Sequence, residues 1–304
     1  ASSAQVVEQA GLRAILGEPV LDFPTPSAQT PDEALSLNKD LIAEYYNSEL
    51  IHICSSPHSI YTCQKKTLAK AVTQAYENDL PIHIHLSETK KEFNDSLASN
   101  KKTPLKYLDD LGLITNKTIL AHSVYLNEDD IKIIRNRKAN IAHCPISNMK
   151  LGSGRMMIEK MFDINILLAS DSVASNNSLD LFSEMRSCSL MHKLHNGADF
   201  LSAEEVLRMA TVNSSIICEK EKERGCLRID KKADFICVDL NRAALNPMYS
   251  IYSNIVYSAE ASDVKDLVVN GKVLMKNRVH TRLDKEKILK NLKDFEEKIK
   301  LFKK

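Results

Sequence analysis

The stretch Pro81-Ile82-His83-Ile84-His85-Leu86-Ser87-Glu88 decides how the rest of the chain is interpreted. It alternates apolar and polar residues, and successive side chains of a β-strand point to opposite faces. A strand here would bury its apolar residues on one face and place both histidines on the other, with Glu88 just past its end. Polar groups at the C-terminal ends of parallel strands are where α/β-barrel enzymes carry their chemistry.

Three later segments end in the same way, which makes chance a weaker explanation than it would be for a single strand. The segments 118–122, 140–145 and 165–170 are each predicted to be strands, and they contain or lead into His122, His143 and Asp171. Helices are predicted around them at 103–111, 128–137 and 156–162. Upstream, helices are predicted at 3–11, 30–47 and 62–78, and strands at 12–17 and 51–54.

Strands that alternate with helices indicate βαβ units and a parallel sheet, hence an α/β fold. Because polar residues gather at one end of successive strands, we expect a closed barrel rather than an open, doubly wound sheet. Further helices are predicted at 179–195 and 203–215, and short β segments at 225–228, 232–238, 264–270 and 272–275. The expected organisation is a barrel over 1–222, a small β-sandwich appendage over 223–282, and a C-terminal helix over 283–304 whose apolar stripe docks on the body.

The composition excludes several classes of protein. The 304-residue chain has a formal net charge of +1, which gives no reason to expect nucleic acid or a membrane surface as a partner. No apolar run is long enough to cross a membrane, and no secretory leader is visible. The seven cysteines lack the paired spacing of a zinc knot or a disulfide framework. We expect a cytoplasmic protein that acts on a small molecule, and no glycine-rich loop indicates a nucleotide cofactor.

Histidines and acids gather where strands are predicted to end: His58, His85, Glu88, His122, His143 and Asp171. Imidazoles and a carboxylate on one rim could bind a divalent first-row metal, leave a position open for water, and lower the pKa of that water. Glu88 could then carry a proton to a leaving group. The other histidines are expected to face solvent or to support the site: His52, His83, His192, His195 and His280.

Four motifs in this order resemble the amidohydrolase superfamily, and most closely its methylthioadenosine/S-adenosylhomocysteine deaminase and chlorohydrolase branch. They are HLSET at 85–89, LAH at 120–122, HCPISNMKL at 143–151 and SDSVASNN at 170–177. The segments AEE at 203–205, MATVN at 209–213 and KAD at 232–234 resemble later signatures of the same branch. The resemblance thus covers nearly the whole chain.

The resemblance implies a role for each matching residue. It implies that His85 and Asp171 bind one divalent metal, zinc or alternatively iron, and that Asp171 also takes a proton from the hydrolytic water. Glu88 would contact the purine and move protons to its ring nitrogen, and His122 would orient the attacking water. His58 and Asn176 are placed among the substrate-binding residues, together with Glu88 and Asp171. A homo-oligomer is a further family expectation.

The sequence departs from the family pattern at three places. The family's first strand carries a His-x-His pair that binds metal, and by strand count this chain begins near the third strand of a (β/α)8 TIM-type barrel. We therefore expect that the first strands lie outside this sequence, and that His85 and Asp171 alone would hold metal weakly. The usual Gly-Thr-Asp-Gly reads Ala-Ser-Asp-Ser at 169–172, which reduces backbone freedom. Arginine is also absent between Arg13 and Arg135, where a clamp for the homocysteine carboxylate is expected.

The function that these residues favour is hydrolytic deamination of an adenine-type nucleoside, in which metal-activated water attacks the aromatic C–NH2 carbon and ammonia is released. Methylthioadenosine and S-adenosylhomocysteine are the family-level substrates, although the missing arginine favours a smaller nucleoside or a free aminopurine. An aminofutalosine deaminase, a guanine deaminase or a triazine chlorohydrolase would share the same residues. A protein of another class, an inactive amidohydrolase-like binding module, is the remaining alternative.

Overall fold

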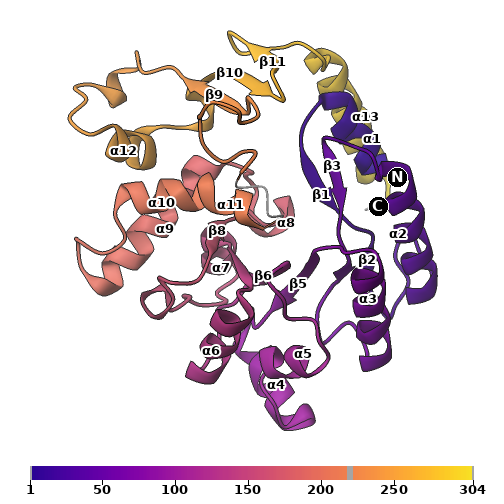
Figure 1. Cartoon of the computed structure of the whole chain (residues 1–304). Helices are drawn as coiled ribbons and strands as arrows, with labels where there is room; N and C mark the ends of the chain where they lie inside the picture. The colour runs from indigo at the N-terminus through magenta and orange to yellow at the C-terminus, as the bar shows by residue number, and fades with distance from the viewer. Residues whose placement is uncertain (1, 218–221, 303–304) are drawn as a thin grey trace.

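The computed structural model describes residues 2–217 and 222–302 (Figure 1). The strands β1 to β8 are Ala14–Leu16, Pro19–Val20, Ile51–Ile53, Ser56–Pro57, Ile82–Leu86, Thr118–His122, Asn140–His143 and Ile166–Leu168. The helices α1 to α7 are Ser2–Ala10, Pro31–Tyr45, Lys65–Glu77, Lys90–Asn100, Pro104–Asp110, Glu128–Arg137 and Pro145–Lys150. The helices α8 to α11 are Val173–Asn176, Leu181–Asn196, Ala203–Ala210 and Val212–Ile216.

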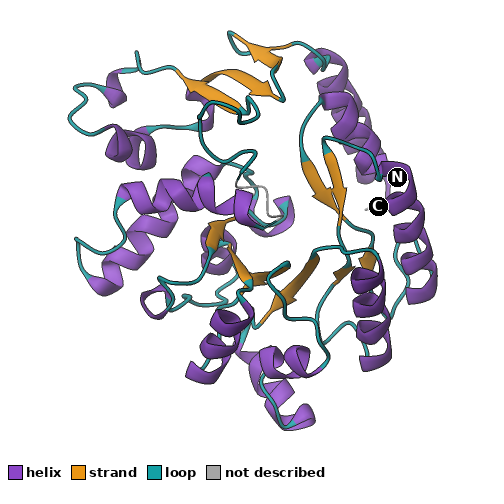
Figure 2. Cartoon of the chain, in the orientation of Figure 1, coloured by secondary structure: helices purple, strands orange, loops and turns teal. Residues whose placement is uncertain are grey.

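The strands β1 to β8 pair in parallel and largely in chain order. β5, β6, β7 and β8 form one four-stranded sheet in that order, while β1 pairs with β3 and β2 with β4. A parallel bridge from Ser55 to Ile82 joins the β3–β4 segment to β5. Figure 2 shows these strands in the middle of the molecule with helices outside them. The predicted α/β class and parallel sheet are therefore confirmed.

The two faces of the β5–β8 sheet carry different packing. Every second residue of β5 is buried, as the opening run predicted. Ile84, Leu120 and Ile141 belong to the large core that also includes side chains of the surrounding helices. Ala142 and Leu167 instead belong to a smaller cluster on the other face. Because side chains alternate along a strand, these two clusters define a helix-covered face and an opposite, inner face.

Sequence signals at the helix ends explain where several of these helices begin. Thr30 caps α2 by accepting a hydrogen bond from the Glu33 amide, and Pro31 occupies the first turn. Asn127 and Asp130 form a reciprocal capping box at the start of α6. The predicted boundaries of both helices at 30–47 and 128–137 consequently lie within about two residues of those found.

Three predicted elements differ from the structure. Residues 156–162 form only a short 3-10 turn, Ile158–Lys160, because the buried residues Met156, Ile158 and Met161 do not share one face of an α-helix. The helix predicted at 203–215 is divided at Thr211 into α10 and α11, and the side-chain Nδ2 of Asn213 donates to the Ile166 carbonyl at 2.7 Å. Residues 225–228 form no strand. The helices α4, α7, α8 and α12 and the short strands β2, β4 and β12 were not predicted.

The C-terminal part forms a four-stranded antiparallel sheet from β9 to β12, Phe235–Val238, Val264–Val269, Lys272–Lys276 and Val279–His280. Short helical turns including α12, Ile251–Ser253, lie between β9 and β10. The helix α13, Lys285–Phe302, follows the sheet. The prediction that its apolar stripe docks on the body is wrong, because Ile288, Leu292 and Phe295 are 42%, 58% and 61% exposed.

Among the helices within 2–217 and 222–302, none combines the length and the apolar character that crossing a membrane requires.

Candidate active site

His85 lies near the C-terminal end of β5, on the face opposite the apolar side chains of that strand. Its Nδ1 is 2.9 Å from the carbonyl oxygen of His58, which can only accept a hydrogen bond. Nδ1 therefore carries the proton, and Nε2 keeps its lone pair. Burial lowers the pKa of His85 despite this hydrogen bond, so the ring is neutral at pH 7. A neutral imidazole with its other nitrogen fixed in this way is the form that binds a metal.

Asp171 follows β8 and is held by two serine hydroxyls. Ser147 and Ser175 both donate to Oδ2, each at 2.6 Å, so neither hydroxyl occupies Oδ1. Burial raises the pKa of Asp171, but these hydrogen bonds outweigh burial and hold the pKa below its ordinary value. The carboxylate is therefore ionised at neutral pH and has an oxygen available for a cation or a water proton.

His122 ends β6 and is 2% exposed. Its Nδ1 donates to Oδ1 of Asn148 at 2.9 Å, which fixes the tautomer and leaves the Nε2 lone pair free. Nε2 lies 3.9 Å from a carboxylate oxygen of Glu88. His122 is thus oriented by Asn148 on one side and faces the predicted proton carrier on the other.

The structure brings His85, His122 and Asp171 together. One ligand atom from each lies within 4.8 Å of the others, and the two imidazole rings stack with centroids 5.5 Å apart. About three protein ligands is the usual number at a catalytic zinc site. His58 stacks on His85 at 4.6 Å, and burial lowers the pKa of His58 to about 4. Of the residues predicted from strand ends, these four and Glu88 therefore form one site.

The backbone at these strand ends is unusual. Ser87, His122 and Asp171 all adopt positive φ values, of 48°, 71° and 59°, which residues other than glycine rarely adopt. Such conformations concentrate at functional sites, where the surrounding structure enforces them. At β6 this conformation has a direct effect: strict alternation from Leu120 would point His122 toward the helices, yet the side chain lies beside His85. The strand ends thus aim their polar groups at the site.

Glu88 is positioned by a neighbour that the sequence analysis did not single out. The carboxylate of Glu92, in the first turn of α4, accepts hydrogen bonds from the amides of Ser87 and Glu88 at 2.9 and 2.8 Å. Burial raises the pKa of Glu92 to about 7. Ser153 donates to Glu88 at 3.5 Å. These contacts fix the loop after β5, and the only sequence signal for them was that an acidic residue follows Glu88 four positions later.

Ser147, Asn148 and Ser175 were likewise missed as supporting residues, although they lie inside the motifs HCPISNMKL and SDSVASNN. The residue predicted in the second motif, Asn176, has its whole amide engaged within the protein. Its nitrogen donates to the Ser170 carbonyl and to Glu184, and its oxygen accepts from the Ser178 amide. Asn176 therefore holds the loop after β8, and contact with substrate stays a prediction.

His143 does not join this site. It is fully buried with its Nε2 3.2 Å from Nε2 of His192. His192 was expected to face solvent or to support the site, and its ring is also fully buried, so it does not face solvent. No unusual φ value redirects His143, so it keeps the helix-covered face of its strand, the face that Ile141 occupies. A strand that ends in histidine thus does not by itself place the ring at the site.

The sequence matches the model of the amidohydrolase family over residues 2–274. It is 39% identical over 292 residues to 5-methylthioadenosine/S-adenosylhomocysteine deaminase of Thermodesulfovibrio yellowstonii, covering 94% of this chain and 66% of that protein. It is 36% identical over 301 residues to 5'-deoxyadenosine deaminase of Methanobrevibacter smithii, covering 98% and 69%. The chain thus spans about two thirds of the length of these curated relatives.

Solved structures agree with this relationship. The crystal structure of an adenosine deaminase from Xanthomonas campestris with bound zinc has a TM-score of 0.95 and 32% identity, covering 98% of this chain and 69% of that one. The structure of atrazine chlorohydrolase TrzN from Arthrobacter aurescens TC1 has a TM-score of 0.87 at 22% identity, covering 95% and 67%, and so resembles this chain in fold. By its family match, its relatives and its fold, the chain belongs to the amidohydrolase family.

Proposed function

We propose that the protein is a metal-dependent hydrolase that removes the amino group of an adenine-type nucleoside as ammonia. The observation that carries this proposal is the convergence of His85, His122 and Asp171, whose ligand atoms lie within 4.8 Å of one another, with Glu88 beside His122. The relatives named as 5-methylthioadenosine/S-adenosylhomocysteine and 5'-deoxyadenosine deaminases support the same class of reaction.

The donor atoms fit a divalent ion, for which we propose zinc, with iron as the alternative. Nε2 of His85 and Oδ1 of Asp171 would bind it, since the hydrogen bonds described above engage the other ring nitrogen and the other carboxylate oxygen. When bound, such an ion supplies a Lewis acid that brings the pKa of a water molecule toward neutrality. The Xanthomonas campestris structure, described as having bound zinc, supports this choice of metal.

Three side chains of the protein would carry out the proton transfers and orient the attacking water. Asp171, kept ionised by Ser147 and Ser175, would accept a proton from the attacking water. Glu88 would deliver a proton to the ring nitrogen next to the reacting carbon and help ammonia to leave. The Nε2 of His122 would accept a hydrogen bond from the water and hold it in line with that carbon.

The substrate we propose is a nucleoside with an uncharged 5' substituent, such as 5'-methylthioadenosine or 5'-deoxyadenosine. The segment between Arg13 and Arg135 contains no arginine that could bind the carboxylate of S-adenosylhomocysteine. The guanidinium of Arg155 is already engaged in a two-bond pair with Glu159, with both distances 2.8 Å. Aminofutalosine, guanine and chlorotriazines are the alternatives within the fold.

Several finer features accompany this proposal. The in-order parallel strands support a (β/α)8 barrel, with barrel, appendage and C-terminal helix over 1–222, 223–282 and 283–304. Free thiols at Cys63, Cys144, Cys188, Cys226 and Cys237 support a cytoplasmic location. We also propose a homo-oligomer on the basis of the family resemblance.

A substrate panel tests the function. Protein expressed from its complete reading frame and loaded with zinc would be given 5'-methylthioadenosine, 5'-deoxyadenosine, S-adenosylhomocysteine, guanine and a chlorotriazine, with ammonia and chloride both measured. We expect ammonia from the first two, less from S-adenosylhomocysteine, and loss of the activity in Glu88→Gln. Chloride release from the triazine, or ammonia from guanine alone, would replace the proposal by one of its alternatives. Absence of any product would favour a binding module.

A further inference from the structure

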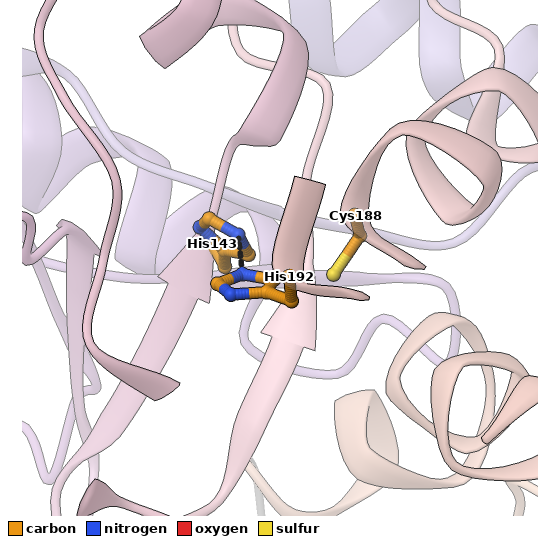
Figure 3. Close-up of side chains that lie close together, drawn as sticks. All are labelled: His143, Cys188 and His192. Atoms are coloured by element: carbon orange, nitrogen blue, oxygen red, sulfur yellow. Dashed lines mark hydrogen bonds between the residues drawn. The ribbon is translucent and has the colours of Figure 1, made fainter. Parts of the chain in front are cut away.

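A second cluster of metal-binding residue types lies apart from the candidate active site. Figure 3 shows His143 at the end of β7 with its ring against that of His192, and the sulfur of Cys188 beside them. Cys188 and His192 are four residues apart on α9 and therefore share one face of that helix. All three side chains are fully buried.

The sheet separates this cluster from the candidate active site. His143 lies on the helix-covered face of β7, whereas His85 lies on the inner face of β5. The two groups share no residue. The cluster also differs chemically, because it offers a sulfur ligand, which the active-site group lacks.

The spacing of the cluster suits a metal ion. The two Nε2 atoms are 3.2 Å apart, and two nitrogens bound to one tetrahedral zinc ion at about 2.0–2.1 Å would be separated by about 3.3 Å. One ligand atom from each of the three residues lies within 4.8 Å of the others.

The protein itself leaves these groups poorly satisfied. Among the described residues, Nδ1 of His143 and Nδ1 of His192 have no hydrogen-bond partner, and the Cys188 thiol takes part in no hydrogen bond. With no partner fixed on Nδ1, either ring can carry its proton there and leave the Nε2 lone pair to an ion. Burial lowers the pKa of both rings, that of His192 to about 4, and so keeps them in the neutral form that binds metals.

We propose that His143, Cys188 and His192 form a buried structural site for a thiophilic d10 ion of the zinc type. Cys188 would bind as the thiolate and release its proton to solvent, and both imidazoles would bind in the neutral form. A bound ion would favour the ionised form of Glu184, one turn before Cys188 on α9, and this carboxylate would offset the positive charge that remains.

Such an ion would tie α9 to β7, which has a consequence for the active site. Glu184 accepts hydrogen bonds from the Ile146 amide and from Asn176, so α9 also holds the loops that follow β7 and β8. The site would therefore stabilise the position of the loop that carries Asp171. The ion would bind as the chain folds, because the fully buried cluster offers no open path from solvent.

Cobalt substitution tests the proposal, because a thiolate bound to Co²⁺ gives a ligand-to-metal absorption band in the near ultraviolet. The protein would be refolded with Co²⁺ in a His85→Ala/Asp171→Asn background, which removes the other metal site and makes the result independent of deaminase activity. We expect the thiolate band, its loss in Cys188→Ala, and more than about tenfold weaker Co²⁺ binding in His192→Gln. Cys63→Ala removes another buried free thiol, and the band should persist there.

The parent protein here is His85→Ala/Asp171→Asn with His143, Cys188 and His192 intact. Its spectrum decides the question even if a further variant fails to fold, which circular dichroism would reveal. Absence of the band from the refolded parent protein would overturn the proposal and leave His143 and His192 as a buried hydrogen-bonded pair. A band that persists in folded Cys188→Ala would also overturn it. A midpoint of thermal unfolding that zinc raises in the parent but not in His192→Gln would support it.

Discussion

Replacing Asn148 by leucine should slow the reaction without a matching loss of stability. The Asn148 oxygen accepts the proton of His122 Nδ1 at 2.9 Å, and both residues are almost completely buried. Leucine has the same branched outline of four side-chain heavy atoms but no acceptor, so this N–H would be left unpaired and the other tautomer of His122 would become populated. An unpaired buried donor costs about 1–3 kcal/mol. That cost corresponds to a decrease of about 5-fold to 150-fold in kcat/KM.

The effect of Asn148→Leu on the free energy of unfolding should be smaller, because the substitution also removes a buried donor that has no partner. In the wild type, Nδ2 of Asn148 is itself buried without a partner among the described residues. Removing that donor relieves a penalty of the same kind as the one created at His122, so the free energy of unfolding should change by only about 1 kcal/mol. Asn148→Asp, which retains the acceptor, should keep more activity than Asn148→Leu.

The assay is ammonia release from 5'-methylthioadenosine by zinc-loaded protein, alongside urea unfolding of each variant. Asn165→Leu is the matched control, because Asn165 precedes β8 and its amide donates to Asn140 and to the Asn213 carbonyl, far along the strand from Asp171. That variant should lose stability while its folded fraction keeps wild-type turnover. Turnover of Asn148→Leu within twofold of the wild type would refute the role assigned to Asn148.

Three further predictions follow from the same contacts. Ser147→Ala/Ser175→Ala should move the acidic limb of the kcat/KM profile to higher pH, because it removes hydrogen bonds that hold the pKa of Asp171 low; an unmoved limb would count against their role. Burial raises the pKa of Glu184 from 4.5 to about 7, so the folded state keeps a proton that the unfolded state loses. The free energy of unfolding of the wild type should therefore fall as the pH rises from 4.5 to 7, and urea unfolding should show a smaller fall in Glu184→Gln. His85→Ala should lower bound zinc by one equivalent on metal analysis, and unchanged zinc would exclude His85 as a ligand.

The parts of the fold that could be predicted are those set by local periodicity. The alternation of 82–86 matches a strand buried on every second residue, and the capping residues Thr30 and Asn127 marked helix starts correctly. Parallel strands also bring their C-terminal ends to one edge. His85, His122 and Asp171 could therefore be expected near one another before any contact was known.

The parts that could not be predicted depend on backbone detail and distant packing. His122 and His143 each end a strand in the same sequence pattern, but only His122 adopts a positive φ and turns to the inner site. The partner of His143 is His192, 49 residues away on α9, and no local pattern links the two. The capping of the loop at Glu88 by Glu92 likewise depends on how α4 follows β5, and α4 itself was not predicted.

The most direct test of the account is hydrolytic deamination of 5'-methylthioadenosine by zinc-loaded protein from the complete reading frame, followed by ultraviolet absorbance and by ammonia release. We expect one ammonia and one oxygen-substituted nucleoside for each substrate consumed, and near-complete loss of turnover in folded Glu88→Gln and Asp171→Asn. Zinc-loaded, folded protein that forms no such product, or variants that retain full turnover, would contradict it.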